Sequence, residues 1–213
     1  MRTFEKDRGA TLPAKRPLFC YITDRRLLPD GSVGALLEHI ESAIAAGVDL
    51  IQLREKDLTD RELFDLASGA ARRARGTSCR ILVNGRLDIA RAAGAHGVHL
   101  PSRGLSAADL ASCLPRGFLL GVSTHTLGEA RRAAAAGAHY LLLGPVFPTP
   151  SKTGSRPLGL RRLQRACAAI PVPILGLGGI GPAEISSVLA AGACGVAGIR
   201  LFQQDPTHLL LPP

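Results

Sequence analysis

The chain of 213 residues contains no tryptophan and only two tyrosines, so aromatic residues make up 4% of it. Single-stranded nucleic acids are bound by basic side chains interleaved with aromatic ones, a pattern that is absent here. The formal net charge of +9 comes mostly from arginines scattered through the expected helices, because only four residues are lysine. We therefore expect no nucleic-acid partner, and a basic surface that attracts phosphorylated metabolites.

Cysteine is scarce and unpatterned: the five cysteines are odd in number and none forms a CxxC motif. Such residues behave as small buried hydrophobes, which fits a reducing compartment. The charged first sixteen residues lack the apolar core of a secretory signal, and no uninterrupted apolar run approaches the length of a membrane span. These absences predict a cytoplasmic protein without membrane contact.

Short apolar runs alternate with helix-like segments from residue 18 onward, which is typical of parallel α/β folds. The expected strands are 18–23, 48–53, 81–84, 97–100, 118–122, 139–143, 172–175 and 194–197. The expected helices are 33–46, 59–75, 87–93, 106–113, 126–137, 160–169 and 182–191, with a short last helix after 202. Eight such units predict a single-domain (β/α)8 TIM barrel at 18–213, preceded by a flexible tail at 1–17.

The segment Gly176–Gly181 has the form G-x-G-x-x-G, which would favour a doubly wound open sheet that binds a dinucleotide. That motif needs an acidic residue at the end of the next strand, and this chain has only small residues there. In a barrel, the same glycines can present backbone N–H groups to a phosphate. The expected phosphate site comprises Gly178, Gly179, Gly198, Ile199 and Arg200.

Polar side chains follow several of the expected strands, where parallel folds build their sites. Strand alternation places Gln52, Arg54 and Lys56 on one face, which indicates either an anion site or a solvated loop. His125, between the fifth strand and its helix, is either an acid–base group or a loop histidine bonded to backbone. Lys152 lies on the long loop 144–159 and is either a phosphate contact on a lid or an ordinary exposed lysine.

Two further histidines, His96 and His99, flank the expected strand 97–100. No third ligand accompanies them, so we predict no zinc site. We interpret His99 as a polar residue at a strand end.

Seven ordered motifs together resemble the thiamine phosphate synthase superfamily over about residues 18–203. They are QLREK from Gln52, VNGRLDIA from Val83, GVHLPS from Gly97, GVSTHT from Gly121, GPVFPTPSK from Gly144, GLGGI from Gly176 and AGACGVA from Ala191. The resemblance implies a (β/α)8 barrel that acts in thiamine biosynthesis. It also suggests a homodimer.

That superfamily has two enzymatic branches, which differ at the ends of the third and fourth strands. Synthases, which join hydroxymethylpyrimidine diphosphate to thiazole phosphate, carry magnesium-binding aspartates where this chain has Gly85 and Gly104. Asn84-Gly85-Arg86 and Leu100-Pro101-Ser102 are the forms of the thiazole tautomerases, and His125 falls where those enzymes keep an acid–base histidine. The resemblance thus implies a tautomerase that aromatises a carboxythiazole phosphate without metal or other cofactor.

Two alternatives remain. Several residues match the contacts of a synthase better, which would require Mg²⁺: Gln52, Arg54, Lys56, Ser123 and Lys152. A non-catalytic barrel that binds a metabolite or serves regulation is the third reading. In every case the expected ligand is a phosphorylated thiazole, contacted by Gln52, Arg54, Lys56, Asn84, Ser123, Thr124 and Lys152. Arg200 stands where both branches have serine.

Overall fold

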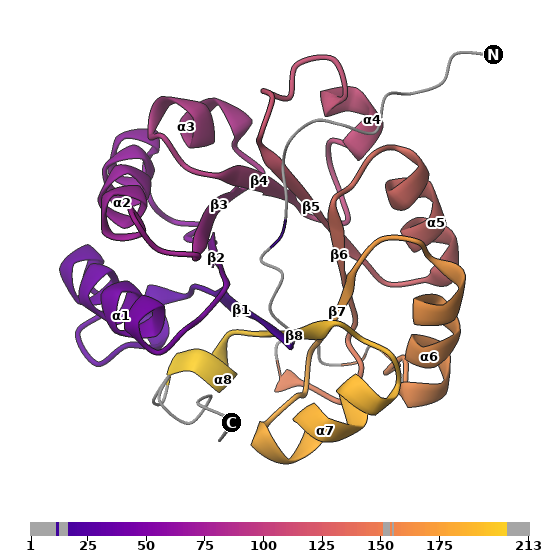
Figure 1. Ribbon diagram of the computed structural model, residues 1–213. Coiled ribbons are helices and arrows are strands. Elements are labelled where there is room, and N and C mark those ends of the chain that lie inside the picture. Colours follow the sequence, from indigo (N-terminus) through magenta and orange to yellow (C-terminus); the bar gives the residue numbers. More distant parts are fainter. Residues whose placement is uncertain (1–11, 13–16, 151–153, 155, 204–213) are drawn as a thin grey trace.

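A computed structural model describes residues 12, 17–150, 154 and 156–203 of the chain. Eight parallel strands pair in sequence order, and the first closes onto the eighth (Figure 1). The strands are β1 (Leu18–Ile22), β2 (Leu50–Leu53), β3 (Arg80–Asn84), β4 (Gly97–Leu100), β5 (Leu119–Thr124), β6 (Tyr140–Leu143), β7 (Ile174–Leu177) and β8 (Gly195–Gly198). This closed sheet confirms the barrel and excludes the open sheet.

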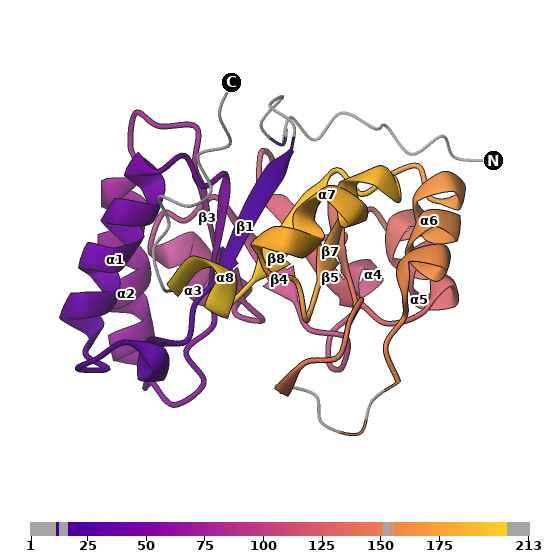
Figure 2. The same cartoon turned by 90° about the horizontal axis from the view of Figure 1, so that it is seen from below.

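Helices follow the strands and surround the barrel; Figure 2 shows α1 and α2 on one side and α5 and α6 on the other. They are α1 (Val33–Ala45), α2 (Asp60–Arg73), α3 (Leu87–Ala92), α4 (Ala107–Leu110), α5 (Leu127–Ala135), α6 (Leu160–Ala169), α7 (Pro182–Ala190) and α8 (Arg200–Gln203). A 3-10 turn, η1 (Arg25–Leu27), follows β1. Within the described ranges, no helix has the length and apolar character needed to cross a membrane.

Side chains on each strand point alternately into the barrel and toward the helices. On β1, Leu18, Cys20 and Ile22 belong to the cluster that fills the barrel interior. Phe19 and Tyr21, on the other face, pack in the larger cluster that joins the strands to the helices. Because both faces are covered, the strands are mostly apolar, which is why short apolar runs located them in the sequence.

Most observed elements match the expected ones within two residues at each end, and the short last helix expected after residue 202 lies earlier, as α8 from Arg200. Strand β7 begins at Ile174 rather than at residue 172, because Pro171 and Pro173 carry no N–H group for a strand ladder. The helix expected at 106–113 shortens to α4, since Ala111 and Cys113 donate to carbonyls three residues back and form turns. The predicted tail 1–17 lies almost entirely outside the described residues.

Candidate functional site

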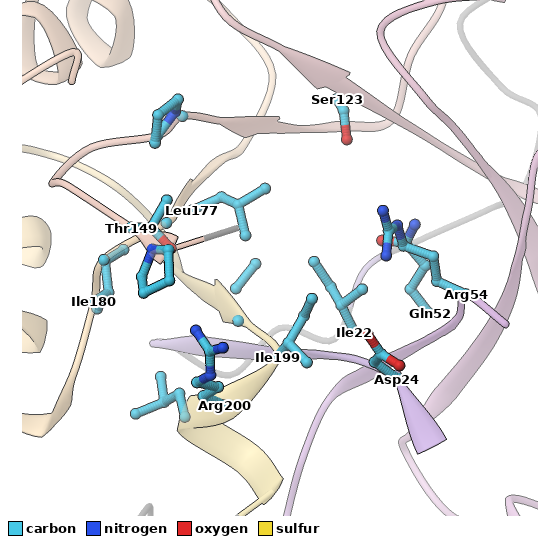
Figure 3. A pocket seen from close by; sticks show the side chains of 18 of the residues that line it. Ile22, Asp24, Gln52, Arg54, Ser123, Thr149, Leu177, Ile180, Ile199 and Arg200 are labelled. Atoms are coloured by element: carbon cyan, nitrogen blue, oxygen red, sulfur yellow. The ribbon is translucent and has the colours of Figure 1, made fainter. Parts of the chain in front are cut away.

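The loops after the carboxyl ends of the strands enclose a pocket of about 660 Å³ at one mouth of the barrel (Figure 3). A cavity of this size suits a small metabolite. Most predicted site residues line it, namely Gln52, Arg54, Lys56, Asn84, Ser123, His125, Gly178, Gly179, Gly198, Ile199 and Arg200. In Figure 3, Gln52 and Arg54 lie opposite Thr149, Leu177 and Ile180. Lys152 lies outside the described residues.

Two amide side chains meet at one wall of this pocket. Gln52 Nε2 donates a hydrogen bond of 2.9 Å to Asn84 Oδ1, which fixes the amide orientation of Gln52. Its carbonyl oxygen, Oε1, is buried and accepts no hydrogen bond from any described residue. A buried polar atom without a partner costs free energy, so a ligand with an N–H or O–H group would be stabilised beside it.

The pocket is positively charged. Arg54, Lys56 and Arg200 line it, and none of them forms an ion pair with a residue in the described part of the chain. Asp24 is the one carboxylate among the described lining residues, and it already pairs with Arg26 at 2.9 Å. Hydrogen bonds from Arg26 hold the pKa of Asp24 below its usual value, and the charge of Arg54 adds to this. The balance of charge favours an anionic ligand.

The loop that carries Arg54 is held by the loop that follows β1. Thr23 Oγ1 accepts a hydrogen bond of 3.0 Å from the backbone N–H of Arg54. The side chain of Glu55 points away from the pocket and is buried, where its carboxylate accepts from the backbone N–H of Arg25 at 3.1 Å. Arg54 and Lys56, on either side of Glu55, both line the pocket.

His125 lies on the loop between β5 and α5, where one hydrogen bond holds its backbone and two contacts orient its ring. Its backbone N–H donates to Glu129 Oε2 at 2.7 Å, and its Nδ1 lies against the carbonyl oxygen of Gly144. Since a carbonyl only accepts, Nδ1 carries the proton in the neutral ring. Nε2 then accepts from the Ser102 hydroxyl, 3.0 Å away at the pocket wall. A histidine so arranged can take a proton at Nε2.

The glycines after β7 have the geometry that an anion site requires. Gly178 and Gly179 adopt φ values of +93° and +67°, where other residues are strained. A Cβ atom at Gly179 would also lie 2.7 Å from Cβ of Phe147, so only glycine fits. No described residue accepts a hydrogen bond from either backbone N–H. Such successive N–H groups before a helix form a concave site for an anion.

Thr124, expected among the substrate contacts, does not reach the pocket. It follows Ser123 on β5 and therefore points to the opposite face, where it is buried and donates to the carbonyl oxygen of Leu142 at 3.2 Å.

His99 is the last residue but one of β4, near the strand end as expected, and it is fully buried inside the barrel. Its ring contacts Tyr140 and Ser123.

Sequence reasoning missed four polar residues that line the pocket: Asp24, Arg26, Ser102 and Thr149. Asp24 and Arg26 follow β1 just as Arg54 follows β2, so the rule that sites form at strand ends could have found them. Ser102 belongs to the motif GVHLPS, but nothing in the sequence predicted its contact with His125.

Comparison with known proteins places the whole barrel in one family. The family model described as "Thiamine monophosphate synthase" matches residues 19–202. A "Putative thiamine-phosphate synthase" of Geobacter sulfurreducens is 46% identical, over 80% of this chain and 81% of that protein. A "Thiamine-phosphate synthase" of Methanoculleus marisnigri is 40% identical, over 82% and 84%.

Among solved structures, a thiamine phosphate pyrophosphorylase from Pyrococcus furiosus superposes with a TM-score of 0.78. It is 28% identical in sequence, and the match covers 90% of each chain. The names of these relatives favour the synthase alternative over the tautomerase expectation.

Proposed function

Because the chain belongs to the thiamine monophosphate synthase family, an enzyme family of thiamine biosynthesis, we propose that it binds a thiazole phosphate at the barrel mouth. The phosphate would accept hydrogen bonds from the N–H groups of Gly178 and Gly179. The ring would then point toward Arg54 and His125 on the other loops. Three lining cations without ion-pair partners in the described part of the chain, Arg54, Lys56 and Arg200, support an anionic ligand.

The geometry supports acid–base isomerisation as the reaction, and the orientation of His125 is the observation that carries this proposal. With Nδ1–H bonded to Gly144, Nε2 is the atom that takes a proton from the ring carbon of a carboxythiazole phosphate. His125 then returns that proton to the exocyclic alkene carbon as the double bonds shift, so the product is an aromatic isomer with no net loss of atoms. Arg54 would hold the carboxylate attached to the ring.

Thiamine phosphate synthesis is the second candidate, and the names of the relatives favour it over the first. One structural observation also supports it: Gln52 Oε1 is buried and without a partner among the described residues. The amino group of a hydroxymethylpyrimidine could donate to that oxygen, whereas a thiazole carboxylate could not.

The synthase reaction would require Mg²⁺, and the residues present do not fit this ion. Mg²⁺ prefers carboxylates and phosphate oxygens as ligands. Gly85 and Gly104 stand where synthases carry aspartates, and the carboxylate of Asp24 is engaged by Arg26. Within the described ranges, no three side chains of His, Cys, Asp or Glu gather closely enough to hold a metal.

One preparation assayed for both reactions separates the candidates. We expect isomerisation of the carboxythiazole phosphate to persist in excess EDTA, and thiamine phosphate formation to be low even with Mg²⁺. Robust thiamine phosphate formation that EDTA abolishes would establish the second candidate and overturn the first. Binding of thiazole phosphate without turnover in either assay would instead support the non-catalytic reading.

A further inference from the structure

Three side chains form a hydrogen-bonded chain from the barrel interior to the pocket. The Tyr140 hydroxyl lies 3.0 Å from His99 Nδ1, and His99 Nε2 lies 2.8 Å from Ser123 Oγ. Tyr140 and His99 are fully buried, whereas Ser123 lines the pocket. The chain thus joins the core to an atom that a ligand can touch.

The direction of these bonds follows from what each group can donate. Tyr140 is buried among apolar side chains, and His99 is its only hydrogen-bond partner among the described residues. A buried hydroxyl that does not donate costs free energy, so Tyr140 donates to Nδ1. The proton of the neutral His99 ring is then on Nε2, which donates to Ser123 Oγ. Ser123 is left with its own hydroxyl hydrogen to donate.

The surroundings keep this arrangement intact. Burial lowers the pKa of His99 to about 3, so the ring remains neutral at ordinary pH. Gly121 on β5 provides the space in which the two rings meet, since a Cβ atom there would lie 2.5 Å from His99 Nδ1 and would overlap Tyr140. No other residue type at 121 would let His99 and Tyr140 meet.

We propose that His99 is a positioning residue, held by Tyr140 as the Nε2–H tautomer, and that it makes Ser123 a dedicated hydrogen-bond donor to the ligand. The ligand atom opposite Ser123 is therefore an acceptor, such as a phosphate or carboxylate oxygen. An N–H group there could donate to the second lone pair of Ser123 Oγ, but it would leave the Ser123 hydroxyl hydrogen without an acceptor in the ligand. The identity of the ligand rests on the proposed function, but the tautomer does not.

The tautomer can be tested without any ligand. We would label the full-length protein with ¹⁵N-histidine and record the ring nitrogens by NMR, assigning His99 by its absence in His99→Gln. We expect an unprotonated Nδ1 and a protonated Nε2. The reverse pattern, or a rapidly exchanging mixture, would overturn the proposal whatever the protein binds.

The effect on binding can be tested by a double-mutant cycle, with thiazole phosphate as the calorimetric probe. Ser123→Ala should weaken binding about three- to tenfold, the range for one hydrogen bond. Tyr140→Phe should weaken binding when Ser123 is present and have no further effect in Ser123→Ala, because the relay ends at that hydroxyl. If the losses of binding free energy in Ser123→Ala and Tyr140→Phe simply add in the double variant, the proposal is contradicted. Ser42→Ala, which removes an exposed hydroxyl on α1, is the matched control.

A second pair of variants guards against misfolding of Tyr140→Phe. His99→Gln keeps an amide donor near Ser123, whereas His99→Leu has none. We expect Gln to retain more of the affinity than Leu, and equal affinities would overturn the proposal. If the wild type does not bind thiazole phosphate, the proposed function fails. The NMR result still decides the tautomer of His99 in that case. The double-mutant cycle is then run with inorganic phosphate as the probe.

Discussion

The hydroxyl oxygen of Ser102 lies 3.0 Å from Nε2 of His125 and joins the loops that follow β4 and β5. The carbonyl of Gly144, after β6, holds the other side of the same ring. Three consecutive strand ends thus fix one imidazole at the pocket wall. This restraint is what a general base needs, because proton transfer depends on the placement of the accepting nitrogen.

Replacing His125 by Gln should lower the rate of thiazole isomerisation by about 10²- to 10⁴-fold, the usual contribution of a general acid–base group. Affinity for thiazole phosphate should change only a few-fold, because the phosphate is held elsewhere. Steady-state kinetics and calorimetry measure the two effects. His96→Gln is the control, since His96 accepts from the backbone of Ile81 away from the pocket. Isomerisation at the wild-type rate would remove His125 from the mechanism.

A comparison of Gly179→Ala with Gly94→Ala distinguishes the effect of backbone strain from that of crowding at the phosphate site. Their φ values are nearly equal, at +67° and +68°, but a Cβ atom meets Phe147 at Gly179 and nothing within 4 Å at Gly94. Each change to Ala should cost about 1 kcal/mol of stability for the left-handed backbone, and Gly179→Ala should cost more because its Cβ atom overlaps Phe147. Only Gly179→Ala should also weaken thiazole phosphate binding, by about tenfold, as its amide is displaced. Equal affinity in the two variants would show that the phosphate binds elsewhere.

The sequence was sufficient to predict the barrel and the polar residues that follow β2. Apolar runs covered on both faces located all eight strands, with errors of up to two residues at their ends. Alternation placed Gln52, Arg54 and Lys56 on one face, and all three line the pocket. The same rule, applied to the neighbouring residues Ser123 and Thr124, would have predicted that their side chains point to opposite faces of β5.

Contacts across the barrel could not be predicted, because they depend on strand register. His99 pairs with Gly121 on the neighbouring strand, and this register lets its ring reach both Tyr140 and Ser123. Nothing in the local pattern around His99 specifies that register. The contact between Ser102 and His125 likewise requires two loops to be placed in three dimensions.

Thr124→Val offers a direct check that neighbouring residues on β5 face different environments. Valine keeps the shape of threonine but loses the hydrogen bond to the carbonyl of Leu142. We expect a loss of about 1 kcal/mol in the free energy of unfolding, measured in urea, because that buried carbonyl loses a donor. Affinity for thiazole phosphate should not change, in contrast to Ser123→Ala. Weaker binding by Thr124→Val with unchanged stability would mean that this side chain faces the pocket.

The buried ring of His99 should make the stability of the protein depend on pH. Burial lowers its pKa to about 3, against about 6.5 in the unfolded chain. Between these values only the unfolded state binds the proton, so the free energy of unfolding should fall as the pH falls below 6.5. From pH 6.5 to 5 this one group should contribute a loss of about 1.5 kcal/mol.

His99→Gln should lack this contribution while keeping those of the other titrating groups, so its stability should fall less steeply over the same interval. Urea unfolding of both proteins at several pH values from 6.5 to 5 measures the difference. Other groups, including His96, whose pKa burial also lowers, act equally in both proteins and cancel in the comparison. Parallel pH profiles for the wild type and His99→Gln would mean that His99 takes up its proton in the folded protein, and that its ring is not sealed inside the barrel.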